Sequence, residues 1–190
     1  MALRGHLGRP VATPLILAST SPQRRAILEQ LGIEFTVQPA DVEELTQGDP
    51  REVVLENALR KARAVEGDLV LACDTEVNVD GEVFGKPANE AEAHAMLDQL
   101  SGRAHEVLGG LVLRCRGEER TAIASTAVYF RELEPADIEN YVATGEWRGR
   151  AGGYAIQGRG AALVERIEGD FWNVVGLPVP ELVRLTKTPC

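Results

Sequence analysis

The sequence contains few of the residues that build disulfide frameworks and zinc sites. Its three cysteines, Cys73, Cys115 and Cys190, include no Cys-x-x-Cys pair. They therefore indicate neither a disulfide framework nor a cysteine-ligated zinc ion. The three histidines have the spacing of neither a metal-ligand set nor a catalytic triad. This cysteine usage is typical of a reducing compartment, so we expect a cytoplasmic protein.

Positive charge is also scarce. The chain has 20 lysines and arginines against 29 aspartates and glutamates, which gives a formal net charge of −9. This balance argues against a general nucleic-acid binder and against a ligand of anionic membranes. Any polyanion must therefore be bound at a local site, and we expect no nucleic-acid or membrane partner.

Long apolar runs, internal repeats and low-complexity linkers are missing from the sequence as well. Residues 1–13 carry Arg4 and Arg9, but the apolar run that follows is too short for a membrane span and poor for a signal peptide. We therefore expect these residues to form a flexible leader. An apolar content of 44% over 190 residues suffices for one good-sized domain, which we place at residues 14–190.

What the chain does contain is an alternation of strand and helix patterns, which predicts an α/β fold. Helices at some connections and a strong hairpin signal at Asp80-Gly81 predict a mixed sheet rather than a purely parallel one. The predicted strands are 15–18, 69–73, the hairpin 77–84, 106–114, 121–129 and 163–167. The predicted helices are 22–31, 50–62, 89–100, 135–143 and a short one from Pro180.

Residues 15–25 are the most informative segment. A short buried strand is followed by Ser21-Pro22, the pattern of a helix N-cap with proline at the first helical position. Arg24 and Arg25 then fall in the first helical turn, where the helix dipole disfavours cations. With the hydroxyls of residues 19–21 beside them, they predict a phosphate site at a strand-to-helix turn. A solvated arginine pair without a ligand is the alternative.

A second candidate site lies at Asp74, where a buried strand ends in polar residues. Strand ends are where α/β sheets place ligands. A two-residue turn at Asp80-Gly81 would pair Val79 with Glu82 and bring Lys86 near Asp74. The pair can be purely structural, contributing about 0–1 kcal/mol if exposed. Beside a phosphate, however, a carboxylate that holds a cation or orients water, with a lysine balancing charge, suits phosphoanhydride hydrolysis.

Three further features have two interpretations each. Glu43-Glu44 can be a pair of metal ligands or a solvated acidic loop. The glycine-rich segment 152–158 includes Gln157, whose amide can hydrogen-bond a base edge, or it is an ordinary loop. Cys73 is a poor candidate nucleophile because it lies inside an apolar run with no adjacent histidine.

The motifs of the chain resemble those of one family, in the same order over nearly all residues after 14. They are Ala18-Ser19-Thr20-Ser21-Pro22-x-Arg24-Arg25, Asp74-Thr75, Gly85-Lys86-Pro87, Leu100-Ser101-Gly102-Arg103-x-His105, Ala151-Gly152-x-Tyr154-x-Ile156-Gln157-Gly158 and Asn173-Val174-Val175-Gly176-Leu177-Pro178. Together they resemble the Maf family of nucleoside triphosphate pyrophosphatases. The resemblance implies hydrolysis between the α and β phosphates to a monophosphate and pyrophosphate, with a divalent cation, Mg²⁺ or Mn²⁺. It also implies an elongated two-lobed α/β fold around a long curved mixed sheet, with a nucleotide cleft between the lobes, and a possible homodimer.

The same resemblance implies a role for individual residues. Asp74 corresponds to the catalytic base and, with Glu44, to the metal-associated acids. The positions that correspond to phosphate-binding residues are Ser19, Arg24, Arg25, Lys61 and Lys86.

The residues that correspond to base-specificity positions do not all match the same branch of the family. Thr75 and Gln157 resemble the branch of the family that acts on dTTP and UTP, whereas the branch acting on 7-methyl-GTP has Asp-Gln and Ser-Glu-Gly forms. Gln23 matches neither branch. The chain also departs from the family pattern at Glu43, Glu76, Trp147 and Arg150. Our leading hypothesis is a dTTP/UTP pyrophosphatase. The alternatives are the same chemistry on another base, such as 7-methyl-GTP, and a nucleotide-binding regulator of cell division without significant turnover.

Overall fold

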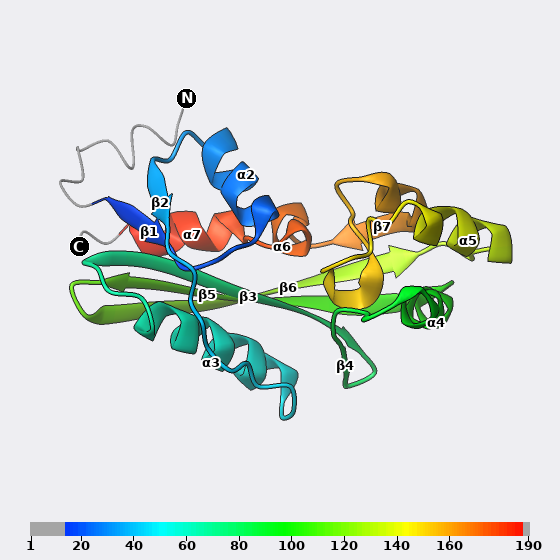
Figure 1. The fold of residues 1–190 in the computed structure, drawn as a ribbon, viewed down its shortest axis with the longest axis horizontal. Helices are drawn as coiled ribbons and strands as arrows, with labels where there is room; N and C mark the ends of the chain where they lie inside the picture. Colours follow the sequence, from blue (N-terminus) through cyan, green and yellow to red (C-terminus); the bar gives the residue numbers. More distant parts are fainter. Residues whose placement is uncertain (1–13, 188–190) are drawn as a thin grey trace.

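The computed structural model describes residues 14–187, which form a seven-stranded mixed sheet with helices packed around it (Figure 1). The strand order is β2-β1-β3-β5-β6-β7, and β4 pairs with β3 outside this path. The strands are β1 (Leu15–Leu17), β2 (Phe35–Val37), β3 (Leu69–Val79), β4 (Glu82–Phe84), β5 (Ala104–Cys115), β6 (Glu118–Phe130) and β7 (Val164–Glu168). β1 runs parallel to both of its neighbours and the other pairs are antiparallel. The prediction of a mixed α/β sheet is therefore confirmed.

The helices cover both faces of the sheet. Helix α3 packs on one face, whereas α2, α6 and α7 lie on the other, and α4 and α5 lie toward the far end of the long strands (Figure 1). Their bounds are α2 (Pro22–Gln30), α3 (Pro50–Arg63), α4 (Glu90–Leu100), α5 (Pro135–Ala143), α6 (Phe171–Val175) and α7 (Val179–Thr186). Two short 3₁₀ turns, η1 (Ala151–Gly153) and η2 (Arg159–Leu163), complete the described chain.

The alternation of side chains along β3 builds two hydrophobic clusters back to back. Leu71 and Cys73 pack with Leu28 of α2 on one face. Val70 and Ala72 pack with Ala58 and Ala62 of α3 on the other. Burying one large apolar side chain stabilises the fold by about 1.5–3 kcal/mol, so these two layers hold α2 and α3 against the same strand.

The edge of β3 that faces β1 and β4 is interrupted. β1 pairs with β3 only as far as Leu17↔Leu71, and β4 joins the same edge only from Val77↔Phe84 onward. The opposite edge pairs with β5 continuously from residue 69 to residue 78. Residues 73–76 therefore have an open edge, to which no strand of residues 14–187 is paired, and polar side chains from both faces of β3 meet there.

The β3–β4 hairpin beside this open edge has the predicted geometry. Asp80 and Gly81 adopt φ of 52° and 91°, the left-handed conformation that a tight two-residue turn requires. Val79 pairs with Glu82 as predicted. The ladder ends at Phe84, so Lys86 follows the strand rather than lying within it.

The remaining expectations concern the cysteines, membrane-spanning segments and the N-terminal residues. Cys73 is a free, buried thiol, and burial raises its pKa to about 11, which agrees with its exclusion as a nucleophile. Cys115, the last residue of β5, is also buried. Within residues 14–187 no helix is both long and apolar enough to span a bilayer. The predicted leader, residues 1–13, lies outside the described residues.

Candidate active site

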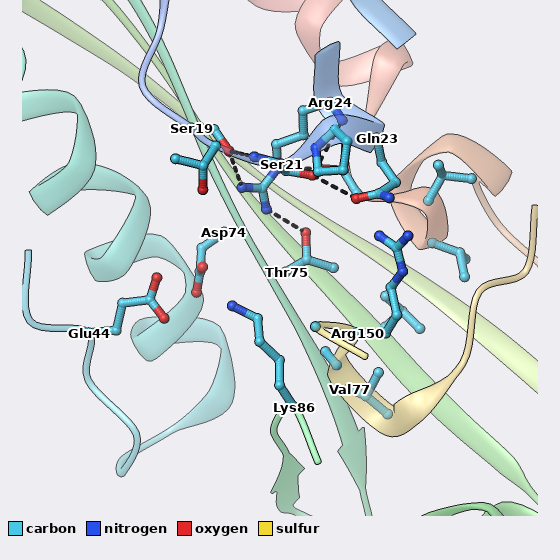
Figure 2. A pocket seen from close by; sticks show the side chains of 18 of the residues that line it. Ser19, Ser21, Gln23, Arg24, Glu44, Asp74, Thr75, Val77, Lys86 and Arg150 are labelled. Carbon is cyan, nitrogen blue, oxygen red and sulfur yellow. Dashed lines mark hydrogen bonds between the residues drawn. The ribbon is translucent and has the colours of Figure 1, made fainter. Parts of the chain in front are cut away.

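A cavity of about 380 Å³ lies against the open edge of β3. Its walls come from the start of α2, the side chains of α3, the residues after β4, and the segments 148–151 and 174–176 (Figure 2). The site residues predicted from the sequence that line it are Ser19, Gln23, Arg24, Glu44, Lys61, Asp74, Thr75, Lys86 and Gln157. One predicted residue, Arg25, is exposed and is not part of the wall.

Arg24 is a buried cation held by neutral groups. Its Nη1 donates to Ser19 Oγ over 3.0 Å, its Nη2 to Thr75 Oγ1 over 3.1 Å, and its Nε to the carbonyl of Gly176 over 2.9 Å. These acceptors fix the plane of the guanidinium without neutralising its charge. A buried arginine of this kind raises the affinity of the cavity for an anion.

The start of α2 adds further anion-binding groups. Ser21 is the N-cap, and its Oγ accepts from the backbone N–H of Arg24 over 3.4 Å. The same hydroxyl donates to Gln23 Oε1 over 3.0 Å. The first turn of α2 contains no acidic residue. The positive end of the helix dipole therefore faces the cavity together with Arg24.

Asp74 is fixed by two side chains of α3. Lys61 Nζ donates to Asp74 Oδ1 over 2.6 Å, and Asn57 Nδ2 donates to Asp74 Oδ2 over 3.1 Å. The Lys61 ammonium also lies 2.6 Å from Glu44 Oε1. Asn57 is 1% exposed and was missed by the sequence reasoning. A polar residue inside the apolar stripe of α3, four residues before Lys61, is the signal that could have found it.

Two adjacent glycines of β5 bring the helices close to these residues. Gly110 pairs with Asp74 and Gly109 with Thr75. A Cβ at Gly110 would collide with the backbone of Val54 in α3, and one at Gly109 with the side chain of Asn173 in α6. The glycine pair thus lets α3 and α6 approach opposite faces of the sheet beside the cavity. Consecutive glycines within a strand are a sequence signal for such close approach.

Glu76 is a third acid near Asp74, on the same face of β3. It is 8% exposed, and its Oε2 has no hydrogen-bond partner among the described residues. The pKa of Glu76 is raised to about 7, chiefly by burial and then by the charges of Asp74 and Glu44, with Lys61 opposing the shift. Glu43 is exposed and, unlike Glu44, does not line the cavity; its backbone carbonyl accepts from Arg60 Nη1 over 3.1 Å.

Residues that could hold a divalent cation are present, but they do not form a closed cage. Within residues 14–187, no three His, Cys, Asp or Glu side chains are arranged to hold a metal ion. Asp74 and Glu44 both face the Lys61 ammonium. Magnesium is commonly bound by one or two carboxylates plus substrate phosphates and water. This donor set fits a cation that arrives with a phosphorylated substrate.

The remaining residues of the site and its surroundings differ in charge and in exposure. Lys86 is exposed, and its side chain extends into the cavity toward Asp74 (Figure 2). Gln157 is exposed on the wall formed by the glycine-rich segment. Arg150 is half-buried and its guanidinium lies on the side of Gln23 and Thr75 (Figure 2). Trp147 is instead buried outside the lining, where its indole N–H donates to the carbonyl of Val142 over 3.0 Å.

Comparison with known proteins places the sequence of this chain in one family. Residues 14–188 match the family described as "Maf-like protein". A protein of Anaeromyxobacter sp. (strain Fw109-5) named dTTP/UTP pyrophosphatase is 51% identical over 93% of this chain and 90% of its own length. Proteins of the same name from Symbiobacterium thermophilum and Thermococcus kodakarensis are 50% and 46% identical, over 90% and 91% of this chain and 91% and 95% of their own lengths. The chain therefore belongs to the Maf family.

Proposed function

We propose that this chain is a nucleoside triphosphate pyrophosphatase that hydrolyses dTTP and UTP to the monophosphate and pyrophosphate. One observation carries the proposal: a fixed carboxylate, Asp74, shares a cavity with Arg24, a buried cation held only by neutral acceptors. The names of the relatives, dTTP/UTP pyrophosphatase, support the same activity. The match over nearly the whole chain supports one catalytic domain, and we place the nucleotide between two lobes of this domain.

The phosphates are bound at the start of α2. Arg24 offers a planar guanidinium whose orientation is already set, and Ser19 offers a hydroxyl beside it. Lys86 brings an exposed ammonium from the opposite wall (Figure 2). Charge that develops on the departing pyrophosphate is stabilised by such preorganised donors, which need no reorganisation during the reaction. Lys61 contributes near Asp74, while Arg25 can act only from outside the cavity wall.

Asp74 is the general base. Lys61 and Asn57 each donate a hydrogen bond to one oxygen of its carboxylate. The orientation of the carboxylate is therefore already fixed. Asp74 accepts a proton from water as the water oxygen forms its bond to the α-phosphorus and the P–O bond to the leaving pyrophosphate breaks. A positioned base of this kind accelerates a reaction by about 10²–10⁴-fold.

A divalent cation, Mg²⁺ or Mn²⁺, would be held by Asp74 and Glu44 together with phosphate oxygens. When bound, it would neutralise phosphate charge and polarise the P–O bond. Lys61 would balance the remaining negative charge of these two acids, since its ammonium already contacts both.

Base preference is assigned to Thr75, Gln157 and Gln23, which all line the cavity. Gln157 can both donate and accept, as the edge of uracil or thymine requires. The relatives support this preference over 7-methyl-GTP and over a regulator without turnover. We also propose a cytoplasmic enzyme that acts without a nucleic-acid or membrane partner and forms a homodimer, which sedimentation analysis would measure.

Pyrophosphate release from a panel of nucleoside triphosphates, with Mg²⁺ or Mn²⁺, tests the proposal. We expect dTTP and UTP to be cleaved with the highest kcat/KM, with the monophosphate as the other product. A higher kcat/KM for 7-methyl-GTP would refute the base preference alone. No pyrophosphate from any nucleotide, despite measurable nucleotide binding, would favour the regulator.

A further inference from the structure

Arg150 is a cationic side chain of the cavity wall with an N–H donor from which no described residue accepts. It is half-buried, and its Nε is enclosed yet has no hydrogen-bond partner among the described residues. The nearby carboxylate of Glu146 accepts instead from the backbone N–H of Arg159 over 2.8 Å. An enclosed guanidinium donor without an acceptor costs free energy, and a ligand with acceptor atoms would recover it.

The position of Arg150 places it at the nucleoside end of the cavity. Asp74 marks the reacting phosphate, and Glu44 and Lys61 lie beside Asp74, whereas Arg150 lies on the side of Thr75 (Figure 2). The apolar part of the lining belongs to this side, because Val77 packs against the turn that follows Arg150, at Gly152. A flat ring with a polar edge fits such a wall better than a phosphate does.

We propose that Arg150 donates a hydrogen bond to a carbonyl oxygen of the uracil or thymine ring, and so is a base-specificity residue of this chain. The inference rests on the proposed function. Uracil and thymine carry two carbonyl acceptors, whereas adenine carries none, and a guanidinium can only donate. Gln157 on the same wall can accept from the ring N–H, so the two side chains together complement the pyrimidine edge.

The identity of the residue also matters. Arginine offers a planar set of five donors, whereas a lysine at this position would offer a point charge. Arg150 can therefore meet a ring carbonyl in the plane of the base. Neighbouring Arg148 is different because it already has partners: it lies over the Trp147 ring, 4.5 Å from its centroid, and pairs with Glu90 at 3.2 Å.

Equilibrium binding by calorimetry separates the base from the phosphates without requiring turnover. UMP and AMP test the base, and inorganic tripolyphosphate tests the phosphate site. We expect Arg150→Met to weaken UMP binding about tenfold or more, the value of a hydrogen bond to a charged donor. Binding of AMP and tripolyphosphate should change less than about twofold, and Arg150→Lys should recover part of the UMP affinity.

Arg159→Met, at an exposed arginine that does not line the cavity, is the control and should leave UMP binding within about twofold of the parent, as a surface substitution does. Unchanged UMP binding by Arg150→Met would overturn the inference. Loss of tripolyphosphate affinity equal to or larger than the loss of UMP affinity would overturn it too, since Arg150 would then bind phosphate. A parent protein that binds UMP through Arg150 but hydrolyses no triphosphate would uphold the inference and refute the proposed function.

Discussion

The ammonium of Lys61 donates to Oδ1 of Asp74 over 2.6 Å. Both side chains are buried, and Asn57 occupies the other carboxylate oxygen over 3.1 Å. The carboxylate therefore points along a direction set by α3, although it belongs to β3. Chemistry at Asp74 thus depends on helix and strand keeping their relative positions.

Asp74→Asn tests this carboxylate. The change keeps size and hydrogen-bonding ability but removes the charge that can accept a proton or hold a cation. We expect pyrophosphate release to fall by at least about 10²-fold, the lower end of what a positioned base supplies. Nucleotide binding should largely survive. Asp80→Asn, at the exposed hairpin tip, is the control, and near-normal turnover by Asp74→Asn would eliminate the assigned role.

Arg24→Ala and Lys86→Ala test the phosphate site. Each removes a cation that faces the cavity, so we expect KM for the triphosphate to rise and affinity for inorganic tripolyphosphate to fall. Added salt should weaken tripolyphosphate binding by the parent, because ions screen these charges. Arg25→Ala tests the exposed neighbouring arginine. A loss of tripolyphosphate affinity as large as that of Arg24→Ala would show that Arg25 also contacts phosphate. Normal binding and hydrolysis by Arg24→Ala and Lys86→Ala would refute the phosphate site.

Gln157→Glu tests base choice. The amide donates and accepts, whereas an ionised carboxylate only accepts and repels the carbonyl groups of a pyrimidine. We expect kcat/KM to fall more for dTTP and UTP than for GTP, since an unpaired buried polar group costs about 1–3 kcal/mol. Equal losses on all bases would mean that Gln157 supports the loop and does not contact the base.

His105 should make stability depend on pH. Burial lowers its pKa to about 4, and its Nε2 lies 2.8 Å from the hydroxyl of Tyr154. In the unfolded chain His105 binds a proton near pH 6.5. The stability that the neutral, buried ring contributes is therefore fully present above that pH. It is lost as the pH falls toward 4, by up to about 3 kcal/mol. Denaturant unfolding should show that the free energy of unfolding differs less between pH 7.5 and pH 4.5 for His105→Gln than for the parent. Equal differences for the two proteins would contradict this role of His105.

Glu76 should act in the opposite direction. Its pKa is raised to about 7, chiefly by burial, and the unfolded value lies near 4.5. Stability is therefore complete below pH 4.5 and is lost as the pH rises through 7, by up to about 3 kcal/mol. With a chelator present, Glu76→Gln should be more stable than the parent at pH 8.5 but not at pH 4.5. The exposed Glu82→Gln serves as the control, and a gain that is independent of pH would count against this assignment.

Local sequence signals were sufficient for much of the fold. The predicted helix 135–143 matches α5 because proline at its first position and its apolar spacing mark both the start and the buried face. The hairpin at Asp80-Gly81 has the predicted register for the same kind of reason. β2 and α6 were not predicted, since elements of three and five residues depend on tertiary contacts more than on their own pattern.

Residues 74–76 show the limit of local reasoning. The prediction ended a strand at Cys73 because polar residues follow, but β3 continues to Val79. Asp74 is accommodated by Lys61 and Asn57 of α3, and Thr75 by Arg24 of α2, which are helices elsewhere in the chain. The same limit applies to the adjacent Arg24 and Arg25. Successive helical residues point about 100° apart, and only packing decides which one is buried.

The interrupted edge of β3 has a consequence for solubility. Leu71 accepts from Ala18 at this edge, so by alternation the peptide groups of Cys73 and Thr75 point into the gap. An exposed sheet edge normally invites another chain to add a strand and begin aggregation. Here β1 and β4 flank the opening on either side, and a strand of four residues is too short to add stably. The protein can therefore keep unpaired peptide groups available at its cavity without offering neighbouring molecules a template.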